Sequence, residues 1–334
     1  MPTRAYAAMA ARQPLQKFEY EPGALGPNQI EVAITHCGIC HSDIHLIDDD
    51  WRMGAFPLVP GHEIVGTVAR TGELVRHVEK GQRVGIGWQC GSCMTCEWCG
   101  KGAEQMCKEN QATCVGHHGG FADSVVVDGR FAFPIPDRLE SENAAPLLCA
   151  GVTVYSPLRA YGVQPWMTVG VIGIGGLGHL ALQFANALGC RVAAFSSSGN
   201  KEAEARSFGA HDFATSTDPT AFADRRGTLD FILSTVFVPL DWAAYLELLR
   251  PFGKLCFVGA VTGTLAIPAM PLIMGQKSIC GSVIGGRPVI AEMLDFAARH
   301  DIKARTELMP MDQCNTAIAR VRESKARYRM VLKN

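Results

Sequence analysis

The chain has 334 residues, more than one hydrophobic core usually covers, so two domains are expected. Its net charge of −1 leaves no basic face for general binding to nucleic acid or to an acidic membrane. No apolar run approaches the ~20 residues that span a bilayer, and residues 1–14 lack the apolar core of a secretory signal. We therefore expect a cytoplasmic protein.

The first 150 residues have a β-rich and loop-rich pattern. Ile30, Val32 and Ile34 alternate with more polar residues, which is the period of a half-buried strand. Glycine and proline interrupt this region often, as at Pro60 and Gly61. No long helical pattern occurs before about residue 141, so this region is expected to be built mainly of strands.

A cysteine cluster lies within this first region. Five of the thirteen cysteines fall between Cys90 and Cys107. Nothing directs the chain to an oxidising compartment, and a dense cluster in a reducing compartment indicates metal binding rather than disulfides. Four thiolates in a lobe of about residues 88–108 suit a closed structural zinc site: Cys93, Cys96, Cys99 and Cys107. A set that uses Cys90 in place of Cys107 is the alternative.

From Trp166 onward, strands alternate with helices. Residues 169–172 form an apolar strand, apolar residues recur at helical spacing over 177–188, and Gly189 follows where a helix would end. Such alternation predicts an α/β fold with a doubly wound parallel sheet. Further elements are expected as strands at 191–195, 230–233, 254–258 and 328–332, and as helices ending near 208, over 242–249 and over 289–300.

A glycine-rich turn joins the first strand and helix of this second region. It matches the G-x-G-x-x-G fingerprint, with a strand before it and an amphipathic helix opening within it. Glycines allow the tight turn and let the backbone approach a pyrophosphate, whose charge is met by the helix N-terminus. A tight turn without a ligand is the plainer alternative, but the setting favours a dinucleotide site. The residues of the turn are Gly173, Ile174, Gly175, Gly176, Leu177 and Gly178.

The end of the second strand of this region distinguishes NAD from NADP. An NAD enzyme usually has an acid about 20 residues after the fingerprint, where it binds the ribose 2′-hydroxyl. Ser196, Ser197 and Ser198 stand there instead, followed by Lys201. A carboxylate would repel a 2′-phosphate, whereas hydroxyls and an ammonium group can bind one. NADP(H) is therefore expected, although a polar loop at a sheet edge would have the same composition.

Three further candidate metal ligands are far apart in the sequence. Cys40, His62 and Cys149 would supply two thiolates and an imidazole, a known catalytic zinc set that leaves a fourth position free. Taken singly, a lone cysteine is more often a buried hydrophobic residue, and a lone histidine more often a hydrogen-bonded core residue. Spacing alone does not join three positions so distant from one another.

The segments around these residues resemble the zinc-dependent medium-chain alcohol dehydrogenases, and most of all their cinnamyl-alcohol-dehydrogenase branch. The resemblance implies a GroES-like catalytic domain over 1–150, a Rossmann NADP-binding domain over 151–284, and a return to the catalytic domain over 285–334. A homodimer is the commonest form of the family. The matching segments keep the family's order: CGICHSDIH from Cys37, PLVPGHEIVGTV from Pro57, the four-cysteine lobe, APLLCAGVTVYSPLR from Ala145, GIGGLGHLA from Gly173 and GSVIGG from Gly281.

The resemblance also implies a role for each metal-site residue. Cys40, His62 and Cys149 match the ligands of the catalytic zinc. Glu63 matches an occasional or exchanging ligand beside it, and Asp43 matches the residue that orients the histidine ligand.

Proton-relay and cofactor positions are implied in the same way. Ser42 matches the family's relay hydroxyl next to the metal, and His45 matches the outer base of the relay. A surface histidine without a function is the alternative for His45. The positions that line the cofactor in the family are matched here by His41, Thr153, Thr235, Gly259, Ser282, Val283 and Ile284.

Two residues depart from the family pattern. Trp88 stands where relatives often have a small residue or cysteine, and Cys90 is an additional cysteine. Both are expected near the structural lobe, where they would not disturb the catalytic set. Trp51 and Leu58 fall in a stretch that contributes to the substrate pocket in relatives, which suggests an apolar or aromatic aldehyde, although core packing explains them nearly as well.

The sequence thus predicts a zinc-dependent oxidoreductase that interconverts primary alcohols and aldehydes with NADP(H). A zinc-free quinone or enoyl reductase would lack the three-ligand set, and a polyol dehydrogenase usually has an acid where this chain has Cys149. A non-catalytic NADP(H)-binding protein would not need an intact proton relay. A zinc-ribbon nucleic-acid binder is disfavoured by the near-neutral charge.

Overall fold

A computed structural model describes residues 2–218, 220–261 and 263–334. The chain divides into two units: unit 1 comprises Met1–Val152 and Ile284–Asn334, and unit 2 comprises Thr153–Val283. The domain assignment made from the sequence stays a prediction, and residues 1, 219 and 262 of its ranges lie outside the described residues. Within the described residues, no helix is both long enough and apolar enough to cross a membrane.

Unit 1 is built on a seven-stranded sheet of order β16-β17-β3-β4-β5-β9, in which β8 also pairs with β3. The alternation expected around residue 30 lies in its central strand β3, where Ile30, Val32 and Ile34 are buried. All its strand pairs are antiparallel except β16 with β17. The strands of unit 1 are β1 (Thr3–Ala7), β2 (Gln16–Tyr20), β3 (Gln29–Ile39), β4 (Glu63–Thr71), β5 (Arg83–Ile86), β6 (Gln89–Gly91), β7 (Gln111–Ala112), β8 (Ser124–Asp128), β9 (Ala132–Pro134), β16 (Thr306–Pro310) and β17 (Arg329–Lys333).

Short helices connect these strands. The predicted strand at 328–332 is β17, and the predicted helix at 289–300 begins two residues earlier, at the residue after Gly286. A π-helical turn over Leu147–Gly151 follows α3. The α-helices that lie in unit 1 are α1 (His41–Asp48), α2 (Glu97–Gly100), α3 (Ser141–Pro146), α10 (Arg287–Arg299) and α11 (Cys314–Arg322). Helix α4 (Val152–Ala160) begins at the last residue of the first segment of unit 1 and continues into unit 2.

Helix α1 was not among the expected elements, although a short helix does not contradict the absence of a long helical pattern before about residue 141. It has only eight residues, and its N-cap is Cys40 rather than one of the usual capping residues. The sulfur of Cys40 accepts the backbone N–H of Asp43, while the Asp43 carboxylate accepts the N–H of Cys40 at 2.9 Å. This reciprocal cap fixes Cys40 at the positive end of the helix.

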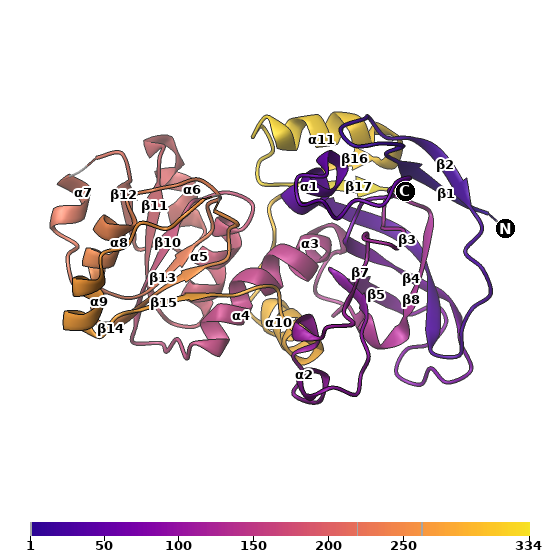
Figure 1. Cartoon of the computed structure of the whole chain (residues 1–334), viewed down its shortest axis with the longest axis horizontal. Helices are drawn as coiled ribbons and strands as arrows, with labels where there is room; N and C mark the ends of the chain where they lie inside the picture. Colours follow the sequence, from indigo (N-terminus) through magenta and orange to yellow (C-terminus); the bar gives the residue numbers. More distant parts are fainter. Residues whose placement is uncertain (1, 219, 262) are drawn as a thin grey trace. The chain divides into compact units, whose positions relative to one another are not determined.

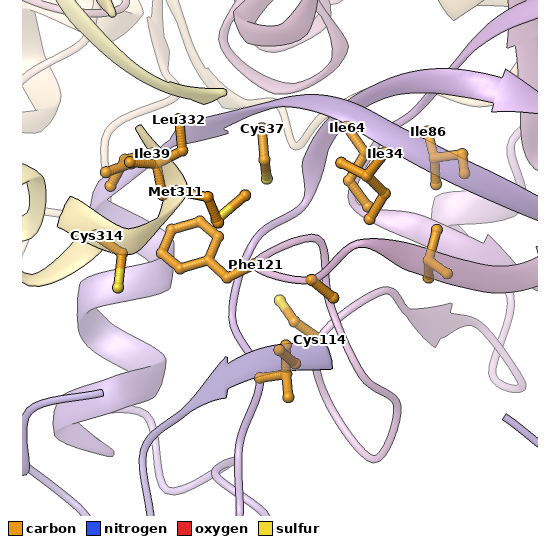
Figure 2. Packing of buried hydrophobic residues seen from close by; sticks show 14 of the residues in the cluster. Ile34, Cys37, Ile39, Ile64, Ile86, Cys114, Phe121, Met311, Cys314 and Leu332 are labelled. Atoms are coloured by element: carbon orange, nitrogen blue, oxygen red, sulfur yellow. The ribbon is translucent and has the colours of Figure 1, made fainter. Parts of the chain in front are cut away.

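The core of unit 1 contains several cysteines that behave as small hydrophobic residues. Figure 2 shows Cys37, Cys114 and Cys314 among aliphatic side chains and the ring of Phe121. The three cysteines and Phe121 are at most 1% exposed. Such packing is typical of a buried free cysteine and requires no metal.

Unit 2 contains a six-stranded parallel sheet of order β12-β11-β10-β13-β14-β15, with helices around it (Figure 1). This is the 3-2-1-4-5-6 order of a doubly wound dinucleotide-binding sheet, so the predicted fold class is confirmed. The two edge strands, β12 and β15, have four residues each and were not predicted. The elements are β10 (Thr168–Ile172), β11 (Arg191–Ser196), β12 (Asp212–Thr215), β13 (Leu229–Ser234), β14 (Leu249–Phe257) and β15 (Ser278–Gly281), with α5 (Gly178–Ala187), α6 (Glu202–Ser207), α7 (Thr220–Ala223), α8 (Trp242–Leu248) and α9 (Ala269–Gly275).

Candidate functional site

Four buried side chains of unit 1 converge on one point. One ligand atom each of Cys40, His62, Glu63 and Cys149 lies within 4.8 Å of the other three. The sulfur of Cys149 lies 4.0 Å from the sulfur of Cys40 and 3.3 Å from Nε2 of His62. Tetrahedral zinc with its usual bond lengths holds such atoms roughly 3.5–3.8 Å apart. The donor set therefore fits a zinc ion.

Local structure places each of these side chains. Cys40 caps α1, His62 directly precedes β4, and Cys149 lies in the π-helical turn. Gly61 turns the chain into His62 with φ +103°, and a Cβ at this glycine would lie 2.6 Å from the ring of Phe121. Only glycine satisfies both conditions, so this turn fixes where the imidazole enters the site.

Asp43 orients the imidazole of His62. Its Oδ1 lies 2.8 Å from Nδ1 of His62 and also accepts the backbone N–H of Gly61 at 2.9 Å. A proton on Nδ1 leaves Nε2, the nitrogen that faces Cys149, free to bind a metal. Burial lowers the pKa of His62, but the Asp43 charge and the neighbouring Cys149 outweigh it and raise the pKa well above its ordinary value.

The two thiols of this site are not equivalent. A hydrogen bond from Cys149 lowers the pKa of Cys40 well below its ordinary value, and the same pairing raises the pKa of Cys149. Two adjacent buried thiols thus release one proton readily and keep the other. A divalent cation would stabilise the negative charge of the second thiolate. Binding of the metal ion is therefore coupled to release of the second thiol proton.

Glu63 is held by Arg329, a residue that the sequence interpretation did not include. Oε1 of Glu63 accepts a hydrogen bond from Nη2 of Arg329, which begins β17. Oε2 of Glu63 is buried and has no hydrogen-bond partner among the described residues. Burial raises the pKa of Glu63 to about 7, while the Arg329 charge opposes the shift. The second carboxylate oxygen is therefore available to the metal group.

Two expected relay residues lie on helix α1. Oγ of Ser42 is 3.6 Å from the sulfur of Cys40, beside the metal group. Nδ1 of His45 is 2.9 Å from Oδ2 of Asp50, a partner that the sequence analysis did not identify. This pairing favours a proton on Nδ1 and leaves the other ring nitrogen as an acceptor.

An aromatic row runs from the relay to the metal group. The ring centroid of Trp51 is 5.0 Å from that of His45 and 6.4 Å from that of Trp88. The Trp88 ring then meets the His62 imidazole edge-on at 4.8 Å. The indole of Trp88 thus packs on a candidate ligand, a contact that the sequence analysis did not include, while the ligand set still converges. Leu58, by contrast, is buried in the core of unit 1.

The four-cysteine lobe brings a second donor set together. Its sulfurs are 3.4–3.9 Å apart in the pairs 93–107, 96–99 and 93–99. These separations again match tetrahedral zinc, here with four protein ligands and no free position. Cys90 is buried outside this group, so the geometry favours Cys107 over the alternative. The group consists of Cys93, Cys96, Cys99 and Cys107.

The glycine turn of unit 2 is shaped by close backbone packing. Gly173 has φ +87°, and a Cβ at Gly178 would lie 1.8 Å from the carbonyl oxygen of Gly173. Oγ1 of Thr235 lies 2.9 Å from the carbonyl oxygens of Ile172 and Gly173 and holds the turn from the next strand. A Cβ at Gly175 would meet no described atom within 4 Å. The backbone of the turn is thus tightly packed at Gly173 and Gly178, whereas no described atom blocks the space next to Gly175, which is where a pyrophosphate would approach.

The serine loop follows β11 directly. Ser196 is buried at the strand end, and its Oγ accepts the N–H of Ser198 at 3.2 Å. Ser197 is exposed. Nζ of Lys201 donates to the carbonyl oxygen of Ile174 at 2.8 Å, which places an ammonium group beside the glycine turn. Hydroxyls, amides and one cation are therefore gathered at this strand end.

The other expected cofactor positions are distributed over both units. Thr153 is buried in α4, and a Cβ at Gly259 would lie 2.1 Å from the carbonyl oxygen of Val236. The N–H of Ser282 donates to the carbonyl oxygen of Phe257 at 3.0 Å, which extends the β14–β15 pairing. Val283 is exposed and ends unit 2, whereas His41 and Ile284 belong to unit 1.

Comparison with known proteins gives concordant matches. Two family models match, "Alcohol dehydrogenase GroES-like domain" over residues 26–137 and "Zinc-binding dehydrogenase" over residues 176–299. The aldehyde reductase AdhA of Synechocystis sp. is 49% identical over 98% of both chains. Among solved structures, a cinnamyl alcohol dehydrogenase of Sorghum bicolor has a TM-score of 0.95 and 38% identity over 100% of this chain and 98% of that one. A cinnamyl alcohol dehydrogenase of Helicobacter pylori, complexed with NADP(H), has a TM-score of 0.91 and 33% identity over 100% and 99%.

Proposed function

The chain belongs to the zinc-binding alcohol dehydrogenase family, in its cinnamyl-alcohol-dehydrogenase-like branch, and we propose that Cys40, His62 and Cys149 hold its catalytic zinc. It is an oxidoreductase that interconverts alcohols and aldehydes with NADP(H). The observation that carries the ligand assignment is the convergence of three donor atoms separated by up to 109 residues of sequence. The GroES-like residues before 151 and after 284 supply this site, and the Rossmann residues between them supply the cofactor site.

The chain's own side chains define what the site does. Zinc bound to this set supplies a Lewis acid for an alcohol or carbonyl oxygen, and NADP(H) supplies the hydride acceptor or donor. Asp43 keeps Nε2 of His62 directed at the metal position. Glu63, fixed at one oxygen by Arg329, offers its other oxygen as an exchanging ligand. Residues 93, 96, 99 and 107 hold the structural zinc.

Ser42 and His45 carry the proton between the substrate oxygen and solvent in this proposal. The Ser42 hydroxyl lies at the metal group, where it accepts the proton of an alcohol substrate or returns it to the product oxygen. His45 is half-buried, and Asp50 sets its tautomer. A buried proton leaves the site only through such a series of exchangeable groups.

We assign apolar or aromatic aldehydes as substrates because the indole of Trp88 packs on His62 and that of Trp51 lies next to Trp88 and His45. The test is a panel of straight-chain aldehydes, aromatic aldehydes and polyols assayed with NADPH and NADH. We expect the highest kcat/KM for an apolar aldehyde with NADPH. Trp88→Ala should lower kcat/KM for aromatic aldehydes by about two- to tenfold, since a lost aromatic contact is worth about 0.5–1.5 kcal/mol. Activity confined to polyols would contradict this assignment.

The NADP preference is assigned to Ser196, Ser197, Ser198 and Lys201. Replacing Ser196 by aspartate puts a carboxylate at the strand end, where it repels a 2′-phosphate and can bind a 2′-hydroxyl. We expect the ratio of kcat/KM for NADPH over NADH to fall by at least about tenfold, the effect of about 1.4 kcal/mol. Ser207→Asp, at an exposed position of α6, is the control. An unchanged ratio in Ser196→Asp would show that this loop does not discriminate.

A homodimer is proposed from the edge of the unit 2 sheet. Among the described residues, β15 pairs only with β14, which leaves one edge of the strand open. Helix α9 exposes Met270, Ile273 and Met274 by 61%, 64% and 77%. An open edge beside exposed apolar side chains is typical of an interface. Sedimentation velocity should give a dimer that Met274→Asp weakens.

A cytoplasmic location is proposed from the cysteines. All thirteen are free, and the proposed zinc sites need six of them as thiolates. Reducing compartments preserve such thiolates, whereas oxidising compartments favour disulfides. Cell fractionation should place the protein with cytoplasmic markers.

A further inference from the structure

Two cysteines of unit 2 lie side by side in its sheet and belong to neither zinc group. Cys256 on β14 and Cys280 on β15 are register partners in the parallel ladder. Residues paired in this way project to the same face, and neighbouring strands lie about 4.8 Å apart. A disulfide closes over Cα separations of about 4.4–6.8 Å. The backbone therefore holds the two Cα atoms at a separation that a disulfide can span.

The pair combines one reachable and one buried thiol. Cys256 is 0% exposed, whereas Cys280 is only part-buried at the edge strand. A hydrogen bond from Cys256 lowers the pKa of Cys280 to about 7; the Tyr161 hydroxyl and the Lys254 charge act in the same direction, and burial opposes them. The pKa of Cys256 is raised by its hydrogen bond with Cys280 and by burial. Cys280 is thus the nucleophile of the pair, since the thiolate is the reactive form.

We propose that Cys256 and Cys280 form a redox-sensitive dithiol that closes to a disulfide by exchange with a small-molecule disulfide of the glutathione class. The Cys280 thiolate attacks one sulfur of that disulfide, breaks its S–S bond and releases one thiolate. The Cys256 sulfur then gives up its proton, attacks the Cys280 sulfur and releases the second thiolate. Two protein thiols lose two electrons, and the small disulfide gains them and the two protons as two thiols.

The bond would tether the edge of the sheet. It would close the loop between β14 and β15, which contains α9, and fix β15 against its neighbour. The carbonyl oxygen of Gly281, the next residue, already accepts the Tyr161 hydroxyl at 2.7 Å.

The test treats the zinc-loaded full chain with oxidised glutathione and maps its peptides without reduction, while a chromogenic chelator reports any zinc release. Trypsin cleaves after Lys254 and Lys277, so Cys256 and Cys280 fall on different peptides. We expect a disulfide-linked pair of these peptides while both zinc sites stay loaded. Dithiothreitol should separate the pair.

Variants distinguish the steps. In Cys256→Ala, Cys280 should retain a stable glutathione adduct, and its alkylation rate should reach half its maximum above pH 7, because the hydrogen bond that lowers its pKa is removed. In Cys280→Ala, the buried Cys256 should remain unmodified. Cys190→Ser, which alters a buried thiol directly before β11 of the same unit, is the matched control and should still give the linked peptides.

Two results would overturn the proposal. A glutathione adduct that persists on Cys280 in the unaltered protein, without linked peptides, would show that the Cys256 sulfur cannot reach it. Absence of any modification at either cysteine, while the protein remains folded and reactive thiols elsewhere are labelled, would show that the pair is inert.

Discussion

Replacing Cys149 by alanine will lower kcat by at least about a thousandfold, which corresponds to about 4 kcal/mol of lost transition-state stabilisation. The substitution removes one of three proposed ligands and leaves Cys40 and His62 to hold the ion, with the carboxylate of Glu63 as a poor replacement. Steady-state kinetics and zinc content check the result. We expect close to one zinc per chain in the variant, retained in the cysteine lobe.

The matched control for this variant is Cys314→Ala. Cys314 is equally buried in unit 1 but packs only among core residues (Figure 2). Both substitutions delete one buried sulfur, so both should reduce stability by a similar amount, about 1–2 kcal/mol. Only Cys149→Ala should lose turnover. Equal activity in the two variants would show that Cys149 is a packing residue.

Replacing Cys107 by serine will act on stability rather than on chemistry. The four sulfurs of the lobe form a closed group without a free position, so zinc there contributes to folding. We expect zinc to fall from two to one per chain and Tm to fall by more than about 5 °C, since a shift of 2–4 °C accompanies each kcal/mol in a domain of this size. At low temperature, kcat should stay within about threefold of the unaltered value.

Cys90→Ser is the control for the lobe. Cys90 is buried close by but lies outside the four-sulfur group. Its serine variant should keep two zinc ions and should lose stability when a chelator is added, whereas Cys107→Ser should show little further loss. Zinc retained in Cys107→Ser but lost in Cys90→Ser would reverse the ligand assignment.

The parallel sheet was largely predictable because each long strand and its following helix carry a clear periodicity. Residues 169–172, 191–195 and 230–233 all fall within strands of unit 2, and the range expected at 254–258 overlaps β14, which ends at Phe257. The four-residue edge strands β12 and β15 are too short to show a period. Helix α1 was missed for a related reason, since its eight residues begin at a cysteine cap that no composition rule identifies.

The site was less predictable, because its residues meet only in three dimensions. Resemblance joined Cys40, His62 and Cys149, whereas spacing did not. Arg329 and Asp50 were missed: Arg329 lies 266 residues beyond Glu63, and Asp50 is one of three consecutive aspartates with nothing to distinguish it. The contact of Trp88 with His62 was missed because Trp88 stands at the start of the cysteine lobe in the sequence, so only a place near that lobe was expected for it.

The most direct test of the metal assignment is an anomalous difference map at the zinc absorption edge, from crystals of active, metal-replete protein. We predict two peaks per chain, one in the cysteine lobe and one within about 2.0–2.3 Å of the Cys40 sulfur, the Cys149 sulfur and Nε2 of His62. A single peak in the lobe, from crystals that still turn over substrate, would contradict the proposed catalytic centre.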